Sequence, residues 1–438
     1  MRDYFFELAD ALLRQCHAHE VLLLTLAGEH SDFVRLNQAL IRQAGSVTQN
    51  LLTLHLIHAQ KQATATLDLS GQLSHDLAQA KQLLTQLREQ LPHLPDDPFL
   101  YYATEIHSSD QVRSAQIPES SAALDEILSK TTGNDLVGIW ANGATYSAFA
   151  NTFGQRNWHS QSSFNFDWSL YHNADKAVKG GYAGDAWDGA LFTYKLDQAR
   201  QQLSALSLPP RTIAPGKYRA YLSPHAVREL LDMMSWGGFG LKSHRAQHTP
   251  LLKMVKEGWR LSPKFSLRED HDEGLTPAFT HTGFIKPQGV DLIHEGIYRD
   301  TLVSARSAKE FNAPLNADHE HPQSLSLSPG LLDQSEILTT LDTGLYINNL
   351  WYCNFSDHNH CRITGMTRFA CFWVERGEIV APINVMRFDD TIYSMFGDQL
   401  LALTHERETL LDASSYEHRS ATSYRLPGAL LEALTLTL

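Results

Sequence analysis

The sequence predicts an α+β protein built from two domains. At 438 residues the chain is too long for one ordinary hydrophobic core, so two domains of roughly 200 residues each are expected. Helical periodicity is concentrated in the first half, whereas the second half has the pattern of short antiparallel strands separated by turns. The Pro- and Gly-rich stretch LPPRTIAPGKY (208–218) is typical of an interdomain crossing. We therefore expect a mixed α/β domain with antiparallel strands at 1–210 and a β-rich domain at 211–438.

The N-terminal domain is predicted to alternate helices with strands. The first 20 residues carry acidic side chains among apolar ones and no A-x-A-like cleavage site, which favours an amphipathic helix over a signal peptide. Residues 74–91 have apolar residues at helical spacing behind Ser74, which can cap the helix. The expected elements are helix 1–20, strands in 20–28 and 46–71, helices 74–91 and 120–130, successive antiparallel hairpins in 135–172, and helix 193–206.

A central helix is predicted at 223–235, directly after a strand at 218–222. Ser223 can cap this helix, and Pro224 suits its first turn, where a backbone N–H has no intrahelical partner. Apolar residues then recur at helical spacing and should form one face of the helix. They are Ala226, Val227, Leu230, Leu231 and Met234. The rest of the chain, to Leu438, is expected to be strands and turns.

Composition and charge argue against several classes of protein. Lys and Arg total 36 against 49 Asp and Glu, and no basic block occurs, so nucleic acid is not expected as a partner. The longest apolar runs, such as VLLLTLA (21–27), are far shorter than the roughly 18 to 20 residues that span a bilayer, so no membrane segment is expected. Only four cysteines occur in this long chain, which argues against a disulfide framework and favours a cytoplasmic location.

The helical zinc-hydrolase motif is absent from the sequence. In that motif two histidines bracket a Glu beside the first of them, so that both imidazoles reach one metal while the Glu activates the bound water. The His-Glu pairs that begin at His19, His294 and His405 have no second histidine at the required spacing. No G-x-S-x-G elbow occurs either, so the sequence identifies no catalytic residue.

Two looser clusters contain residue types that bind metals, NADHEHPQ (316–323) and DHNHC (357–361). In an extended strand, side chains at i and i+2 point the same way, so each histidine pair could form half of a site. A zinc site normally needs three or four convergent ligands, and the alternative is a polar, solvated loop in a chain with 22 histidines. The candidate ligands are His319, His321, His358, His360 and Cys361.

Two further motifs are interpreted as turns. REDHDEG (268–274) could hold a cation through Asp270, Asp272 and Glu273, but a solvated turn that ends in Gly is the simpler interpretation. KGGYAGDAWDG (179–189) lacks the spacing of a phosphate-binding loop, which favours turns or close backbone approaches.

The C-terminal region resembles the TldD/PmbA family, whose members are regarded as zinc-dependent peptidases and are also named as modulators of DNA gyrase. The family shows a Thr-Gly turn, an apolar strand, an E-N-G-E-I hairpin and a P-V strand in this order. Here these motifs stand as Thr364-Gly365, Phe372–Val374, Glu375–Ile379 and Pro382-Ile383, with Arg376 in place of Asn. REDHDEGLTPAF, SPHAVRELLDMM, and SHDLAQAKQLLTQL followed by DDPF are also similar to family segments, so the resemblance covers most of the chain.

The family that the chain resembles contains two subunit types. In the TldD type a central helix carries an H-E-x-x-x-H zinc motif and a cysteine nearer the C-terminus completes the site, whereas the TldE or PmbA type lacks both. Here no histidine occurs between His225 and His244, and the expected Cys-Gly-Lys segment is missing. The chain therefore resembles the non-catalytic partner, so no cofactor is expected in it and zinc is expected in a TldD-type partner.

The leading hypothesis is a TldE/PmbA-like subunit of a cytoplasmic metalloprotease that cleaves or matures unfolded peptides. The resemblance implies a hollow dimer, with a TldD-type subunit or with a second copy of this chain, in which the zinc-free subunit binds extended peptides by strand addition. An autonomous metallohydrolase is one alternative, and it requires the two histidine clusters to meet within about 5 Å. A stand-alone protein that holds peptides without hydrolysis is the other.

Overall fold

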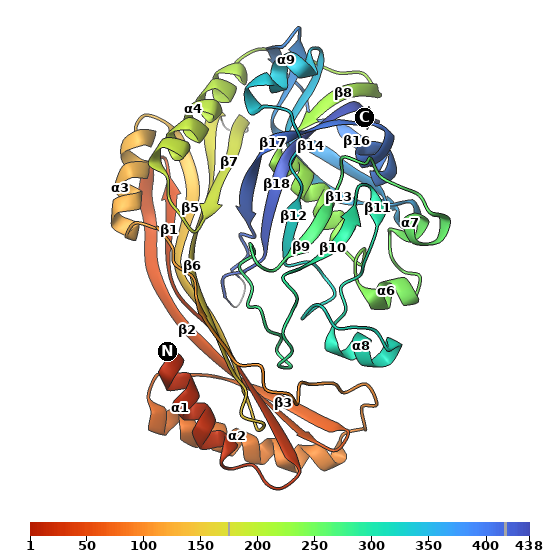
Figure 1. The fold of residues 1–438 in the computed structure, drawn as a ribbon. Coiled ribbons are helices and arrows are strands. Elements are labelled where there is room, and N and C mark those ends of the chain that lie inside the picture. The colour runs from red at the N-terminus through yellow and green to blue at the C-terminus, as the bar shows by residue number, and fades with distance from the viewer. Residues whose placement is uncertain (174–175, 416–417) are drawn as a thin grey trace.

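Two large sheets organise the chain, which the computed structural model describes at residues 1–173, 176–415 and 418–438. Figure 1 shows the first sheet as a long curved wall and the second sheet beside it, with helices flanking both. The predicted α+β class is confirmed. The predicted domain boundary at residue 210 falls in the connection between the last strand of the first sheet and the first strand of the second.

The first sheet contains seven strands in the order β3-β2-β1-β5-β6-β4, with β7 also paired to β6. Neighbours are antiparallel except β4 and β6, which run parallel. The prediction of successive short hairpins in 135–172 is wrong, because this segment forms one hairpin of two long strands. The strands are β1 Glu20–Asn37, β2 Leu40–His58, β3 Lys61–Asp68, β4 Ser109–Val112, β5 Asp135–Asn151, β6 Arg156–Asn173 and β7 Lys176–Gly184.

The two faces of β6 differ in chemistry. Trp158, Phe166 and Trp168 lie on one face and are buried in the apolar cores beneath the helices. Residues of odd number lie on the other face, and several of them are polar yet buried, among them Asn157, His159, Gln161 and Ser163. Ser160 and Ser162 interrupt the apolar alternation, which is why the sequence suggests short runs where one long strand forms.

Four helices cover the outer face of the first sheet. They are α1 Arg2–Leu13, α2 Leu73–Gln90, α3 Ser120–Thr131 and α4 Gly189–Ala205, and a short 3-10 turn, η1 Leu91–His93, follows α2. The predicted cap at Ser74 is wrong, because α2 begins at Leu73 behind Gln72. The carboxylate of Asp76 instead accepts hydrogen bonds from the Ser70 and Gly71 N–H groups and holds the entry to the helix.

The second sheet contains eleven strands in the order β11-β10-β9-β12-β18-β16-β14-β13-β8. β15 pairs with β14 and β17 with β18, and β18 also pairs with β8, so part of the sheet closes on itself. Its strands are β8 Gly216–Leu222, β9 Leu267–Asp270, β10 Gly289–His294, β11 Ile297–Tyr298, β12 Ser324–Leu327, β13 Gly344–Asp357, β14 Arg362–Glu375, β15 Glu378–Pro382, β16 Arg387–Thr391, β17 Leu400–Leu411 and β18 Ser423–Leu436.

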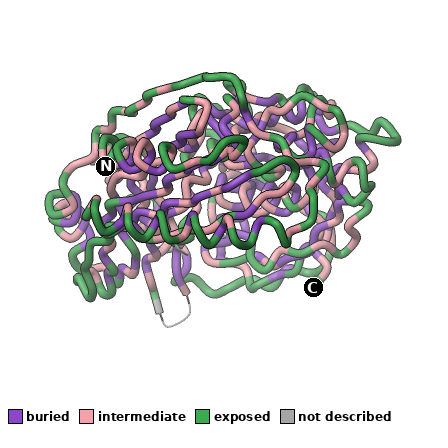
Figure 2. The backbone as a smooth tube through the Cα atoms, turned by 90° about the horizontal axis from the view of Figure 1, so that it is seen from below, coloured by how far each residue is buried: buried purple, intermediate pink, exposed green. Residues whose placement is uncertain are grey.

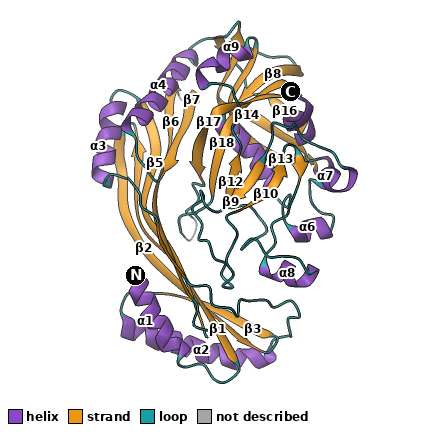
Figure 3. Cartoon of the chain, in the orientation of Figure 1, coloured by secondary structure: helices purple, strands orange, loops and turns teal. Residues whose placement is uncertain are grey.

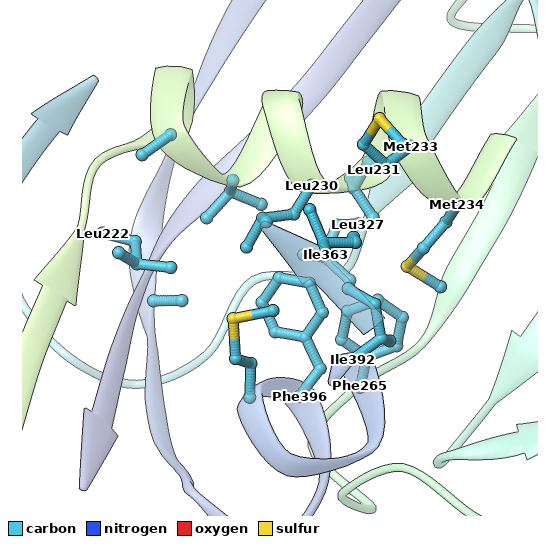
Figure 4. Close-up of a cluster of buried hydrophobic side chains, with 14 of the residues drawn as sticks. Leu222, Leu230, Leu231, Met233, Met234, Phe265, Leu327, Ile363, Ile392 and Phe396 are labelled. Atoms are coloured by element: carbon cyan, nitrogen blue, oxygen red, sulfur yellow. The ribbon is translucent and has the colours of Figure 1, made fainter. Parts of the chain in front are cut away.

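The predicted central helix is α5, Pro224–Ser235. Ser223 Oγ accepts a hydrogen bond from the Ala226 N–H at 3.3 Å, and Pro224 opens the first turn, as the sequence predicts. All five residues of the predicted face are buried. Figure 4 shows Leu230, Leu231 and Met234 directed toward Phe265, Ile363 and Phe396, and burying each such side chain contributes about 1.5 to 3 kcal/mol.

The second half of the chain has more helix and longer strands than its sequence pattern indicates. β13, β14 and β18 have 14 residues each, because bulges let them continue past irregular pairs. The short helices are α6 Leu241–Arg245, α7 Leu252–Glu257, α8 Ala305–Phe311, α9 Ile337–Leu341, the 3-10 turns η2 Gln334–Glu336 and η3 His358–His360, and the π turn η4 Ser394–Asp398. Long antiparallel strands therefore occur in both halves of the chain.

The uncovered inner face of the first sheet turns toward the second sheet, and β7 lies beside β17 and β14 (Figure 3). Figure 2 shows buried residues concentrated on the strands, with exposed segments around them. Across the described residues, no helix combines the length and apolar character needed to cross a bilayer. Two cavities lie where the first sheet faces the C-terminal part.

Candidate functional site

An interdomain cleft runs between the inner face of the first sheet and the elements around α5. One cavity of about 470 Å³ and another of about 530 Å³ share Trp168 and Lys179 as lining residues, so the two adjoin each other. The first cavity lies over β5 and β6, and the second lies between β7, α4 and the start of α5. We refer to both together as the interdomain cleft.

The sheet wall of the cleft combines apolar surface with a few polar groups. Lys179 Nζ of β7 lies 3.3 Å from the Asp167 carboxylate of β6, and both side chains face the first cavity. Ile139 of β5 lines the same cavity and is 52% exposed. This wall therefore offers an apolar contact beside an ion pair.

The helix wall is formed by the first turns of α5. His225 lines the second cavity and Glu229, one turn later, lines a small cavity that adjoins it. Burial lowers the pKa of His225 to about 4, so its imidazole is neutral at neutral pH. Burial, reinforced by the Asp232 carboxylate, raises the pKa of Glu229. The pair can exchange hydrogen bonds with a peptide backbone.

Charged side chains at the rim of the cleft are paired within the chain. Lys195 Nζ donates to Glu408 Oε2 at 2.6 Å. Burial alone would raise the pKa of Glu408, but the Lys195 ammonium holds it below its ordinary value. Arg228 donates to the Leu411 carbonyl at 3.2 Å and stacks on the Tyr424 ring, which fixes the end of β17 at the cleft.

Comparison with known proteins places the chain in a family. Residues 215–438 match the family described as PmbA/TldA metallopeptidase C-terminal domain. The chain belongs to the TldD/PmbA family. The resemblance found in the sequence is therefore confirmed.

Solved structures of the same fold cover nearly the whole chain. TldE from Thermococcus kodakarensis is 13% identical with a TM-score of 0.78, and the match covers 95% of this chain and 97% of that chain. Structures described as candidate modulators of DNA gyrase come from Thermotoga maritima and Bacteroides thetaiotaomicron. They are 13% and 12% identical with TM-scores of 0.75 and 0.73, and the matches cover 99% of this chain and 100% and 98% of theirs. At these identities the likeness shows the fold alone, and no curated protein matches the sequence.

The TldD-type zinc motif does not fit the residues on α5. Glu229 follows Arg228 instead of a histidine, and Met233, where a second histidine of an H-E-x-x-x-H motif would stand, is buried in the apolar core. Cationic guanidinium and a buried thioether are not zinc ligands in such sites. The helix therefore lacks the ligand pair of the TldD-type motif, and we derive no metal-dependent step at this cleft.

The DHNHC cluster is a tight turn at the surface and not an extended strand. His358–His360 form the 3-10 turn η3, in which His360 Nδ1 lies 2.7 Å from Asp357 Oδ2 and the His358 ring packs edge-on against Phe355. Cys361 points the other way, into the core, and burial raises the pKa of its thiol. The histidines and the cysteine of this cluster thus face different environments.

The NADHEHPQ cluster lies elsewhere, in the loop before β12. The His319 and His321 rings are nearly parallel, with centroids 5.3 Å apart. In the part of the chain that the structure describes, one set of three His, Cys, Asp or Glu side chains has ligand atoms within 4.8 Å of one another: His281, Asp318 and His319. The convergence that the metallohydrolase alternative requires, between this cluster and His358, His360 or Cys361, is not among the described contacts.

The REDHDEG segment forms a turn. Asp270 accepts hydrogen bonds from the Asp272 N–H at 3.2 Å and the Glu273 N–H at 3.1 Å. Glu273 is ion-paired with Arg425 of β18. Its acidic groups are therefore engaged in the local structure, in line with the interpretation of this segment as a turn.

Sequence reasoning missed several residues of the cleft and of the histidine set. In the sequence His225 stands out only as the start of a histidine-free stretch that ends at His244, and no local pattern places it at the cavities. Lys179 lies in a segment interpreted as turns, and its role follows from the pairing of β6 with β7. His281 is 37 residues from Asp318, and no local pattern connects the two.

Proposed function

We propose that this chain is a TldE-type, non-catalytic subunit of a cytoplasmic metallopeptidase complex that cleaves or matures unfolded peptides. In this proposal a TldD-type subunit supplies the zinc, and this chain completes the wall of a shared chamber and holds the peptide. A second copy of this chain is the alternative partner. The observation that carries the proposal is a peptide-sized cleft lined by α5, a helix without the H-E-x-x-x-H zinc motif.

The inner face of the first sheet supports peptide binding. Asn165 and Asp167, at alternate positions of β6, line the first cavity and are partly exposed. Polar groups on this wall can form hydrogen bonds with the N–H and C=O groups of an extended peptide. A polar face of this kind suits a substrate of variable sequence.

The edge of the first sheet supports strand addition. Among the described residues, β7 pairs with β6 alone, and its segment 178–184 lines the second cavity. Gly180 and Gly181 let the Trp168 and His225 side chains approach the main chain closely, and the Asn348 amide donates to the Lys179 carbonyl at 3.0 Å. An extended peptide could pair with the remaining main-chain groups of β7.

The proposal is tested with a permanently unfolded polypeptide, such as a reduced and carboxymethylated protein. The purified chain should bind it without cleaving it, and Ile139→Asp should weaken binding at least about tenfold, because a charge replaces the apolar contact in the cleft. Val112→Asp is the matched control, since Val112 is also an exposed β-branched residue of the first sheet but lines neither cavity of the cleft.

Three outcomes would contradict the proposal. Peptidase activity of the isolated chain would favour the autonomous hydrolase. Failure to recover a TldD-type protein, from cells that contain one, would favour a stand-alone binding protein. Binding that Ile139→Asp and Val112→Asp weaken equally would exclude the cleft as the binding site.

A further inference from the structure

A loop of the C-terminal part contacts the lower end of the first sheet, at some distance from the cleft. It connects β9 to β10, and its Phe279 packs with Leu23, Ile57 and Phe149 of the N-terminal part. The Ala103 N–H donates to the Thr282 carbonyl at 2.9 Å, and Gln155 Nε2 donates to the Gly283 carbonyl at 2.7 Å. These contacts on both sides of His281 fix its backbone. We call this region the loop contact.

Gly283 makes the turn beside His281 possible. Its φ of +89° lies in the left-handed region, and a side chain at this position would meet Phe149 Cζ at 2.7 Å. The turn is therefore held closely against the first sheet, and the His281 side chain is directed away from it toward the loop before β12.

His281 meets Asp318 and His319 in that neighbouring loop. Asp318 Oδ1 accepts from the His281 N–H at 3.0 Å and lies 2.6 Å from His281 Nδ1. His319 Nε2 lies 3.7 Å from Asp318 Oδ2, and the two histidine rings are nearly parallel, with centroids 5.8 Å apart. Three potential ligands from two loops thus converge on one point.

We propose that His281, Asp318 and His319 bind a divalent transition-metal ion of the Zn²⁺ type. This site is separate from the cleft, and it goes beyond the proposed function because it gives the chain a metal of its own without a hydrolytic role. His321, beside His319, is the nearest further donor. The leading hypothesis expects no cofactor in this chain, although His319 and His321 are candidate ligands in the sequence, and the proposal revises that expectation.

The present distances are close to those that such an ion needs. Ligand atoms about 2.0 to 2.2 Å from a tetrahedral Zn²⁺ lie about 3.3 Å from one another. The two carboxylate-to-imidazole distances, 2.6 and 3.7 Å, lie on either side of this value. The His281 and His319 side chains are 53% and 46% exposed, so a shift of a fraction of an ångström meets little resistance. An entering ion would replace the proton between His281 Nδ1 and Asp318.

The ligand chemistry favours a transition metal over Mg²⁺ or Ca²⁺. Two imidazole nitrogens with one carboxylate suit Zn²⁺ and its neighbours, whereas Mg²⁺ and Ca²⁺ prefer oxygen ligands throughout. A cavity of about 470 Å³ opens beside the set, between His55 and Asp97 on one side and His319 and Glu320 on the other. It leaves room for a water molecule or for His321 to complete the coordination.

Metal binding would stabilise the loop contact. The ion would join the loop that carries His281, which is anchored on the first sheet, to the loop that carries Asp318 and His319. All three ligands belong to the C-terminal part, so the ion would not bridge the two halves of the chain directly. It would instead restrict the motion of the loop whose Phe279 packs on the first sheet.

The experiment is a titration of the EDTA-treated full chain with Zn²⁺ by calorimetry, and with Co²⁺ followed by its visible absorption. One Zn²⁺ should bind per chain, and His281→Ala and His319→Ala should each weaken binding at least about tenfold. His360→Ala is the matched control, because His360 also pairs with a neighbouring aspartate, at 2.7 Å, but no third ligand joins it within the described residues.

Absence of stoichiometric Zn²⁺, or Zn²⁺ binding that survives both substitutions or falls equally with His360→Ala, would overturn the proposal. A second measurement needs no variant: Zn²⁺ should protect His281 and His319, but not His360, from diethyl pyrocarbonate. Unchanged modification of His281 and His319 would also overturn it. Peptidase activity is assayed on the same samples, so Zn²⁺ bound without hydrolysis supports this site independently of the peptide-binding proposal.

Discussion

The interdomain cleft and the loop contact both lie between the N-terminal sheet and the C-terminal part, but their polar groups differ in exposure and in charge. In the cleft, His225 is neutral because it is buried, and Lys195 and Glu408 neutralise each other. At the loop contact, His281 and His319 remain largely exposed around one carboxylate, while apolar packing of Phe279 holds the loop. The cleft is therefore suited to hydrogen bonding with a peptide, and the loop contact to binding an ion.

The largest expected effect is on the loop contact. Phe279→Ala removes a side chain that is 4% exposed and packed among Leu23, Ile57 and Phe149, so the free energy of unfolding should fall by about 3 to 5 kcal/mol. Urea denaturation followed by tryptophan fluorescence measures it. Phe284→Ala, in the same loop but only half-buried, is the control and should cost less than about 2 kcal/mol. Equal losses would show that Phe279 is not the anchor.

The next effect concerns the cleft. Lys195→Met leaves the Glu408 carboxylate without its 2.6 Å partner in a partly buried position, so the free energy of unfolding should fall by about 1 to 3 kcal/mol. Lys253→Met breaks an ion pair between neighbouring turns of α7 and should change stability by no more than about 0.5 kcal/mol. If the two variants are equally stable, the cleft pair contributes no more than a surface pair.

The last effect is a pH dependence, and it is small at any one pH near neutrality. The pKa of His225 is lowered to about 4 in the folded chain against about 6.5 when unfolded, so between these values only the unfolded chain binds the proton. Its contribution is complete above pH 6.5 and is lost as the pH falls toward 4. His225→Asn should reduce the slope of unfolding free energy against pH by up to about 1.4 kcal/mol per pH unit in this range. An unchanged slope would mean that His225 is solvated in the folded chain.

Local chemistry made α5 predictable from the sequence. A cap at Ser223, a proline at the first helical position and apolar residues at helical spacing all act within one or two turns, and the structure has each of them. Ser74 is not the cap of α2. Asp76, in the same turn, instead accepts hydrogen bonds from the Ser70 and Gly71 N–H groups. Family membership was also accessible, because it rests on an ordered series of short motifs.

Long-range contacts were not predictable from the sequence. β6 packs against helices on one face and faces the C-terminal part on the other, so its sequence shows no single alternation of apolar and polar residues. The full length of the strand is therefore not visible in the sequence. The two histidine clusters have similar compositions, and they differ because His281 approaches Asp318 from a distant loop whereas Asp357 meets only its neighbour His360. Convergence of side chains across loops determines a candidate site, and local composition does not reveal it.

The most direct test of the account is to place a photo-crosslinking amino acid at position 139 in the cleft and, in a separate sample, at position 112 outside it. An unfolded polypeptide should crosslink to position 139, remain uncleaved, and crosslink to position 112 only at background level. Equal crosslinking at both positions, or cleavage of the polypeptide by the isolated chain, would contradict the assignment of the cleft as a non-catalytic peptide-binding site.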